Sequence, residues 1–167
     1  YTSQKIFTFA ETVDLIFKGI SGLIPLALLM MLAFAIGTVC RELGTGLYTA
    51  ELSKQWLAPD FVPVIIFLVG CFIAFSTGTS WGTFAIMLPI GIPMAQALDA
   101  NLYLTVAAAL GGGVFGDHCS PISDTTIISS MASASDHIDH VKTQLPYALT
   151  AGAITAVLYL VLGVLIH

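Results

Sequence analysis

Uncharged apolar runs alternate with short polar segments along this chain, and they predict where its helices lie. Residues 19–40 contain no charged side chain and match the roughly 20 residues that a membrane-spanning helix needs. Residues 5–18 mix apolar positions with Glu11, Asp14 and Lys18 at helical spacing, which predicts an interfacial helix. Residues 47–60 are predicted to be a polar connection with Trp56 as an interface anchor.

A second uncharged run, residues 61–98, is too long for one crossing and short for two with a loop. Its middle is rich in hydroxyl groups and interrupted by glycine, so we predict a re-entrant hairpin of two half-length helices. Irregular backbone at membrane depth must be buried in protein or line a cavity. A polar external loop between two short spans is the alternative. The predicted tip residues are Ser76, Thr77, Gly78, Thr79 and Ser80.

The third run, residues 102–116, leads into a polar stretch, residues 117–124 (DHCSPISD). Pro121 has no N–H, so a helix that continued through it would leave the carbonyl of Asp117 without its usual donor. We therefore predict a broken helix over residues 100–135, with carboxylate and bare carbonyl oxygens together at membrane depth. Oxygen ligands of this kind suit a hard cation.

The end of the chain contains a polar stretch, residues 136–145, and a last apolar run, residues 146–166. The stretch is predicted to be a turn. His137 and His140 within it could bind a metal, but a solvated loop is the simpler interpretation, because loops are polar by default. The last run is predicted to span the membrane. These segments together predict an all-α polytopic membrane protein with spanning helices, a re-entrant helical hairpin and a broken helix.

Composition supports a membrane location. The chain is 57% apolar and 9% charged, whereas soluble domains carry about 25% charged residues. The net charge of −5 and the lack of a basic patch give no support for a nucleic-acid partner. The three cysteines have no framework spacing and are expected to be free thiols. Because the first residue, Tyr1, is not methionine, we expect a piece of a longer protein.

The distribution of charge indicates what the broken helix could bind. No lysine or arginine occurs between Lys54 and Lys142, so Asp117 and Asp124 have no basic partner in that stretch. Buried charges are normally paired or neutralised. The available neutralisers are a proton, a metal cation, or a basic residue from another part of the protein. The first two together describe a proton-coupled cation carrier.

The helix ends on either side of the break favour different roles for the two aspartates. The negative carbonyl end of the first half-helix favours a cation, and the N–H groups of the second half-helix favour an ionised Asp124. Asp117 is then the expected proton carrier. His118 either relays protons or only hydrogen-bonds a neighbouring helix.

Two stretches resemble the signature motifs of NhaC-type sodium/proton antiporters, a family of the ion transporter superfamily. They are residues 75–83 (FSTGTSWGT) and 116–126 (GDHCSPISDTT), and the likeness extends through residues 136–141 (DHIDHV). It covers roughly residues 20–166. The resemblance implies inverted repeats, each with a re-entrant hairpin and a broken helix. It also implies that residues 1–167 are the C-terminal repeat, without the N-terminal one.

The activity implied by the resemblance is sodium/proton antiport, a secondary active transport across a prokaryotic cell membrane and not an enzymatic reaction. Organic-acid or amino-acid exchange coupled to Na+ or H+ is the alternative. No cofactor is expected, because Na+ and H+ are transported. The expected partners are the lipid bilayer, the absent N-terminal repeat and a second copy in a homodimer. The candidate ion-coupling residues are Asp117, His118, Ser120, Ser123, Asp124, Thr125 and Thr126, with Asp117 and Asp124 as Na+ ligands.

Two other classes of function remain open. An intramembrane metalloenzyme could use Asp117, His118, Cys119 and Asp124 as zinc ligands, although three adjacent ligands are poorly spaced for a tetrahedral site and no HExxH pair occurs. A purely structural membrane subunit would not need unpaired aspartates at the membrane midplane.

Overall fold

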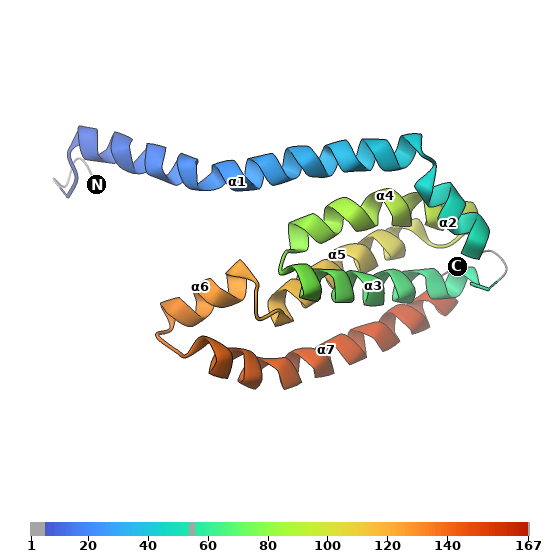
Figure 1. Cartoon of the computed structure of the whole chain (residues 1–167). Helices are drawn as coiled ribbons and strands as arrows, with labels where there is room; N and C mark the ends of the chain where they lie inside the picture. Colours follow the sequence, from blue (N-terminus) through green and yellow to red (C-terminus); the bar gives the residue numbers. More distant parts are fainter. Residues whose placement is uncertain (1–5, 54–55, 167) are drawn as a thin grey trace. The chain divides into compact units, whose positions relative to one another are not determined.

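The computed structural model describes residues 6–53 and 56–166, and these residues are almost entirely helical, with no strand among them (Figure 1). The all-α prediction is therefore confirmed. The helices are α1 (Phe9–Glu42), α2 (Thr45–Ser53), the short 3-10 helix η1 (Pro59–Phe61), α3 (Val62–Thr77), α4 (Ser80–Leu98), α5 (Leu102–Cys119), α6 (Asp124–Ala132) and α7 (His137–Leu165).

The chain divides into two compact units, Tyr1–Leu32 and Ala33–His167. In the first unit, Thr8 and Glu11 cap the start of α1 reciprocally. Glu11 Oε2 accepts from the Thr8 N–H at 2.8 Å, and the Glu11 N–H donates to Thr8 Oγ1 at 3.3 Å. This is the capping-box arrangement.

Helix α1 corrects the predicted division into an interfacial helix (residues 5–18) and a separate span (residues 19–40). Residues 9–40 of the two segments lie in one helix, Phe9–Glu42, residues 6–8 precede it without helical structure, and residue 5 lies outside the described residues. Gly19 and Gly22 fall near the predicted boundary. A single glycine only weakens a helix, by about 1 kcal/mol relative to alanine, so neither is enough to end it.

The predicted polar connection over residues 47–60 is also wrong in part, because Thr45–Ser53 forms α2. Gly46 and Ala50 are its buried residues. A Cβ atom on Gly46 would lie 2.6 Å from Cβ of Pro93, so the backbone of α2 lies directly against α4. Burial against α4 explains why this short helix forms despite its polar composition.

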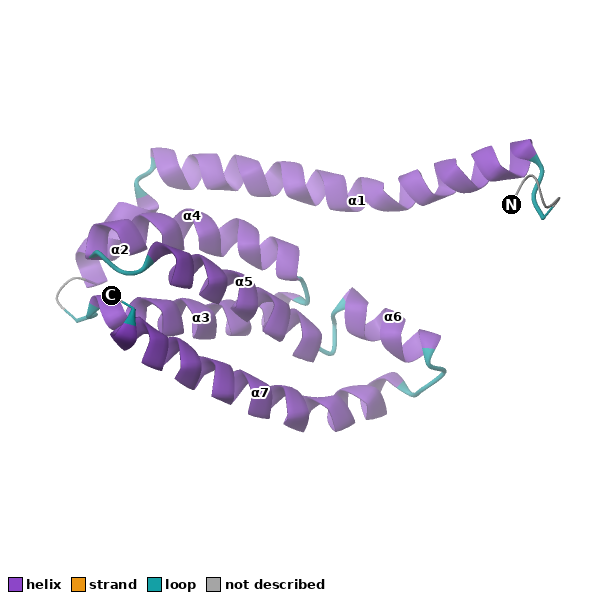
Figure 2. Cartoon of the chain, turned by 180° about the vertical axis from the view of Figure 1, so that it is seen from behind, coloured by secondary structure: helices purple, strands orange, loops and turns teal. Residues whose placement is uncertain are grey.

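Helices α3 and α4 form an antiparallel hairpin (Figure 2). Gly78 ends α3 at φ +68°, a left-handed conformation that favours glycine, and Thr79 caps α4 by accepting from the Gly82 N–H at 3.4 Å. The helices have 16 and 19 residues, or about 24 and 28 Å at 1.5 Å per residue. They are therefore longer than the half-length helices that we predicted. Three helical segments of the described chain are long and apolar enough to cross a membrane: Pro59–Thr77, Ser80–Leu98 and His137–Leu165.

Close backbone contact holds α5 along α3. A Cβ atom on Gly112 would overlap the Phe67 carbonyl oxygen, and one on Gly116 would overlap the Cys71 carbonyl oxygen. Phe67 is buried at the centre of the core. Because α5 runs in contact with α3 along this stretch, the C-terminal end of α5 lies beside the hairpin tip.

Helix α7 begins well before the predicted last span, residues 146–166. Asp136 accepts hydrogen bonds from the N–H groups of Ile138 and Asp139, at 2.9 and 3.1 Å, and starts the helix at His137. The predicted turn over residues 136–145 is therefore mostly the first turns of α7. Pro146 lies within the helix, as membrane helices tolerate. The Phe67 ring contacts Tyr159 of α7, with centroids 5.2 Å apart.

Candidate functional site: the broken helix and the hairpin tip

The break consists of residues 120–123, between the end of α5 and the start of α6. Ser120 and Ser123 both have extended backbone, with ψ of 130° and 135°. The Ser120 N–H donates to the Asp117 carbonyl at 3.1 Å. The carbonyl that Pro121 was predicted to leave bare is therefore occupied, which corrects that part of the prediction.

The hairpin tip and the break are in direct contact. Ser120 is fully buried, and its hydroxyl donates to the Phe75 carbonyl of α3 at 2.7 Å. A Cβ atom on Gly78 would lie 2.9 Å from the Ile122 carbonyl oxygen. The two stretches that carry the sequence motifs thus form one structural site, although some 45 residues separate Ser120 from Phe75.

Asp117 is the buried carboxylate of this site, and its side-chain partners are hydroxyl groups. Ser123 Oγ donates to Asp117 Oδ1 at 2.6 Å, Thr125 Oγ1 lies 3.5 Å from Oδ2, and the two hydroxyl oxygens are 2.7 Å apart. Asp117 is only 7% exposed. We call Asp117, Ser123 and Thr125 the hydroxyl cluster. It presents carboxylate and hydroxyl oxygens without a lysine or arginine nearby in sequence, which is an environment for a proton or a hard cation.

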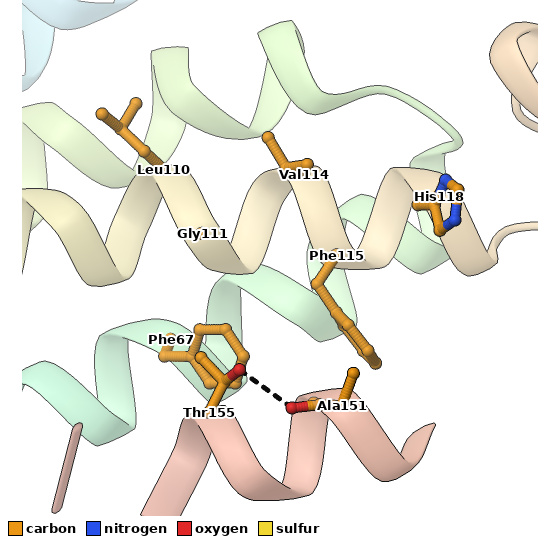
Figure 3. Close-up of a pocket in the computed structure, with 9 residues that line it drawn as sticks. Phe67, Leu110, Gly111, Val114, Phe115, His118, Ala151 and Thr155 are labelled. Atoms are coloured by element: carbon orange, nitrogen blue, oxygen red, sulfur yellow. Dashed lines mark hydrogen bonds between the residues drawn. The ribbon is translucent and has the colours of Figure 1, made fainter. Parts of the chain in front are cut away.

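His118 belongs to a different face of α5. Successive helical residues point about 100° apart, and the His118 ring lies against an apolar groove of about 430 Å³ lined by α3, α5 and α7 (Figure 3). Gln144 of α7 contacts His118 Nε2 and donates to the His118 carbonyl at 3.1 Å. In the described part of the chain no hydrogen bond links His118 to the hydroxyl cluster. His118 thus contacts a neighbouring helix, and the proton-relay role stays a prediction.

Thr126 and Asp124 begin α6 in contrasting environments. Thr126 is buried, and its hydroxyl donates to the His118 carbonyl at 3.3 Å, so it ties α6 back to α5. Asp124 is exposed, and within residues 6–53 and 56–166 no hydrogen bond connects its carboxylate to the hydroxyl cluster. The structure thus separates the environments of the two aspartates that the sequence placed together.

The hydroxyl groups at the hairpin tip mostly serve the hairpin itself. Ser76 and Thr77 are exposed and each donates to a carbonyl one turn back in α3, at 2.8 Å. Thr79 caps α4, and Ser80 is the half-buried first residue of that helix. In the part of the chain that the structure describes, the tip contacts the break through the Phe75 carbonyl and Gly78.

Sequence patterns did not reveal two side chains of α7, one of which contacts the break and the other the end of α5 that precedes it. His137, predicted to be part of a solvated turn, lies 2.7 Å from the Pro121 carbonyl through Nε2. Gln144 contacts His118, as above. The signal available in the sequence was that both His137 and Gln144 are polar residues directly before an apolar run. The Phe75 carbonyl gave no signal at all, because every residue has a carbonyl group.

The zinc interpretation gains no support from the geometry. Within the described residues, no three His, Cys, Asp or Glu side chains gather in a group that could hold a metal ion. Asp117 and His118 point to different faces of α5, and Cys119 is buried. Three adjacent residues of a helix therefore do not form a tetrahedral ligand set here.

A family model described as the Na+/H+ antiporter family matches residues 1–164. The chain belongs to this family. Family membership and the three candidate spans make it part of a multi-pass membrane protein, and its named relatives are antiporters. No solved structure matches the chain.

Curated relatives of this family member are considerably longer than the chain. An uncharacterized protein of Haemophilus influenzae is 46% identical over 87% of this chain and 28% of its own length. A malate-2H(+)/Na(+)-lactate antiporter of Bacillus subtilis is 30% identical over 94% of this chain and 34% of its own length. The Na(+)/H(+) antiporter NhaC of Alkalihalophilus pseudofirmus is 30% identical over 85% of this chain and 30% of its own length. The chain thus spans about a third of the length of these relatives.

Proposed function

We propose that this chain supplies the cation- and proton-binding elements of a sodium/proton antiporter in the cell membrane. The observation that carries the proposal is the burial of Asp117 among hydroxyl groups, in a stretch without lysine or arginine. A buried carboxylate without a basic partner is stable only when a proton or a cation neutralises it. Asp117 can satisfy this condition with either ion, but not readily with both.

Competition for Asp117 would couple the two ions. When Asp117 is protonated, the carboxyl group can remain hydrogen-bonded to Ser123 and needs no counter-ion. When Na+ replaces the proton, both carboxylate oxygens and the lone pairs of Ser123 and Thr125 become ligands. The hydroxyl protons can rotate away from the ion, because each hydroxyl has two lone pairs. One buried site that holds H+ or Na+ in turn couples the two ions when it is exposed alternately to the two sides of the membrane.

Asp124 has a different role in this proposal. It lies exposed at the start of α6, beside Thr125. A carboxylate at that position attracts a cation electrostatically without holding it in a buried site. We therefore place Asp117 at the binding centre and Asp124 at its entrance. The remaining partners of the full-length protein, namely its other repeat and a second copy in a dimer, are part of the same proposal.

Sodium-driven pH change in vesicles carrying the full-length protein tests this function. We expect Asp117→Asn to abolish exchange at every sodium concentration, because a neutral amide neither takes up and releases a proton near neutral pH nor supplies the negative charge that binds Na+. Asp124→Asn should raise the sodium concentration for half-maximal exchange and leave the maximal rate largely intact. Asp99→Asn is the matched control, because Asp99 is an exposed aspartate at the far end of α4 with φ 58°, a conformation that asparagine tolerates. Wild-type exchange in Asp117→Asn would refute the proposal.

Exchange of organic acids or amino acids is the second candidate function. Relatives named a malate-2H(+)/Na(+)-lactate antiporter and an arginine/ornithine antiporter are each 30% identical to this chain, as is NhaC. Uptake of labelled malate, lactate or arginine into the same vesicles separates the two candidates. Uptake that depends on Asp117, without a sodium-driven pH change in the absence of organic substrate, would favour this alternative.

A further inference from the structure

His137 connects three segments at the edge of the break. Its Nε2 lies 2.7 Å from the Pro121 carbonyl oxygen, and its Nδ1 lies 3.2 Å from Ser130 Oγ of α6. His137 is itself the first residue of α7. The side chain is half-buried. One imidazole ring thus joins the break, α6 and α7.

The protons of this arrangement can be assigned in part. A carbonyl oxygen can only accept, so His137 Nε2 must carry the hydrogen in its bond to Pro121. Ser130 Oγ also lies 2.8 Å from the Ile127 carbonyl, and a hydroxyl has one proton. With a neutral imidazole, Ser130 turns that proton to Nδ1. With an imidazolium, Nδ1 donates to Ser130, which donates to Ile127. The bond to Pro121 persists in both states.

Two hydrogen bonds connect the break to neighbouring helices. The Ser120 hydroxyl donates to the Phe75 carbonyl of α3, and His137 of α7 donates to the Pro121 carbonyl. Ser123, two residues beyond Pro121, donates to Asp117. Rotation of the peptide group after Pro121 would therefore shift Ser123 relative to the carboxylate. The hydrogen bond from His137 to the Pro121 carbonyl restricts that rotation.

We propose that His137 is a positioning residue for the ion site: its hydrogen bond to Pro121 fixes the break in the conformation that places Ser123 on Asp117. The bond is independent of the capping of α7, because the Asp136 carboxylate performs the capping. The expected effect of His137 on transport rests on the proposed sodium/proton exchange. Its expected effect on the conformation of the break does not, and the two effects can be measured separately.

Cys119 reports on the conformation of the break. It is 4% exposed, so a membrane-permeant thiol reagent reaches it only when the break opens locally. The experiment uses the full-length protein with Cys40 and Cys71 of this chain, and any cysteine outside it, replaced by alanine. The labelling rate of Cys119 is measured in vesicles, and the sodium KM and kcat of exchange are measured in the same preparation.

Three substitutions of His137 distinguish the effect of losing its hydrogen-bond donor from the effect of changing its side-chain volume. His137→Gln places an amide N–H near the position of Nε2 and keeps the bond to Pro121. His137→Asn places its amide near Nδ1, too short to reach Pro121, and His137→Leu removes every donor. The loss of one hydrogen bond corresponds to a change of about 5- to 10-fold in an equilibrium. We therefore expect His137→Leu and His137→Asn to speed Cys119 labelling and raise the sodium KM about 5- to 10-fold, with kcat near wild type. His137→Gln should leave the labelling rate and the sodium KM near their wild-type values.

His140→Leu is the matched control, because His140 is also a half-buried histidine of α7 and lies one turn further along the helix. Labelling that is unchanged in His137→Leu and His137→Asn would overturn the proposal, as would equal effects in His140→Leu. If His137→Leu does not insert into the membrane, the labelling rates and sodium KM values of His137→Asn and His137→Gln decide whether the proposal holds. Faster labelling in a protein that does not exchange sodium for protons, even as wild type, would support the positioning role and refute the proposed function.

Discussion

The Ser120 hydroxyl donates to the Phe75 carbonyl at 2.7 Å and joins the ends of two helices. Helix α3 ends at Thr77, so the Phe75 carbonyl belongs to the last turn, where carbonyl groups lack an intrahelical donor. Ser120 directly follows the end of α5. Each helix end thus helps to satisfy the polar groups of the other, and this pairing assembles the candidate site.

Removal of that bond should destabilise the protein. Ser120→Ala leaves the Phe75 carbonyl without its side-chain donor in a partly buried setting, which costs about 1 kcal/mol. Ser76→Ala is the control, because its exposed hydroxyl donates to the Phe72 carbonyl within the same helix. The control should change stability by less than about 0.5 kcal/mol. Thermal unfolding of the full-length protein in detergent measures both, and equal losses would contradict the role of Ser120.

Substitution of Gly78 tests the contact between the tip and the break. Gly78 has φ +68°, and an added Cβ would also lie 2.9 Å from the Ile122 carbonyl. Gly44 has a similar φ of +65°, and no atom of the described part of the chain lies within 4 Å of its Cβ position. A left-handed conformation costs an L-residue about 1–2 kcal/mol, so Gly44→Ala measures the backbone cost alone. Gly78→Ala should lose more stability than this control and should also impair exchange. Equal losses in the two variants would mean that the tip and the break are not in contact.

The close packing of α3 and α5 predicts a large effect at Gly116. A Cβ atom there would overlap the Cys71 carbonyl oxygen, and forcing extra volume into a packed core costs about 1–3 kcal/mol. Among the residues that the structure describes, none has an atom within 4 Å of a Cβ position on Gly22 of α1. Gly22→Ala should therefore stabilise the helix by about 0.5–1 kcal/mol. Opposite signs of the two effects in detergent unfolding would support the packing, and the same sign would contradict it.

The capping of α1 predicts a pH-dependent contribution to stability. Hydrogen bonds from the backbone N–H and the hydroxyl of Thr8 lower the pKa of Glu11. A lowered pKa in the folded state means that the stabilisation is present above the unfolded value and is lost as the pH falls through the folded value. Carboxyl titration by NMR should place the pKa of Glu11 below its ordinary value of 4.5. Thr8→Val removes the hydroxyl but keeps the backbone donor, so it should raise this pKa only part of the way.

The sequence by itself determined the helical nature of the chain, the position of the break and the chemical groups near it. These features follow from local physics. Uncharged runs predict apolar helices, Pro121 cannot donate to a helix, and Gly78 permits a left-handed turn. The helix lengths were harder to predict from the sequence. Capping by Asp136 starts α7 well before its apolar run, and α2 forms in a polar segment, where Gly46 packs against Pro93.

Only the tertiary structure decided which groups near the break remain available to an ion. The carbonyl groups of His118 and Pro121 accept hydrogen bonds from Gln144 and His137 of α7. Asp117 is buried, and Asp124 is exposed. Local sequence could not reveal this, because the partners come from other helices: Gln144 and His137 from α7, and the Phe75 carbonyl from α3. Those approaches depend on the backbone contact of α5 with α3, where Gly112 and Gly116 allow two helices to come closer than any larger side chain would permit.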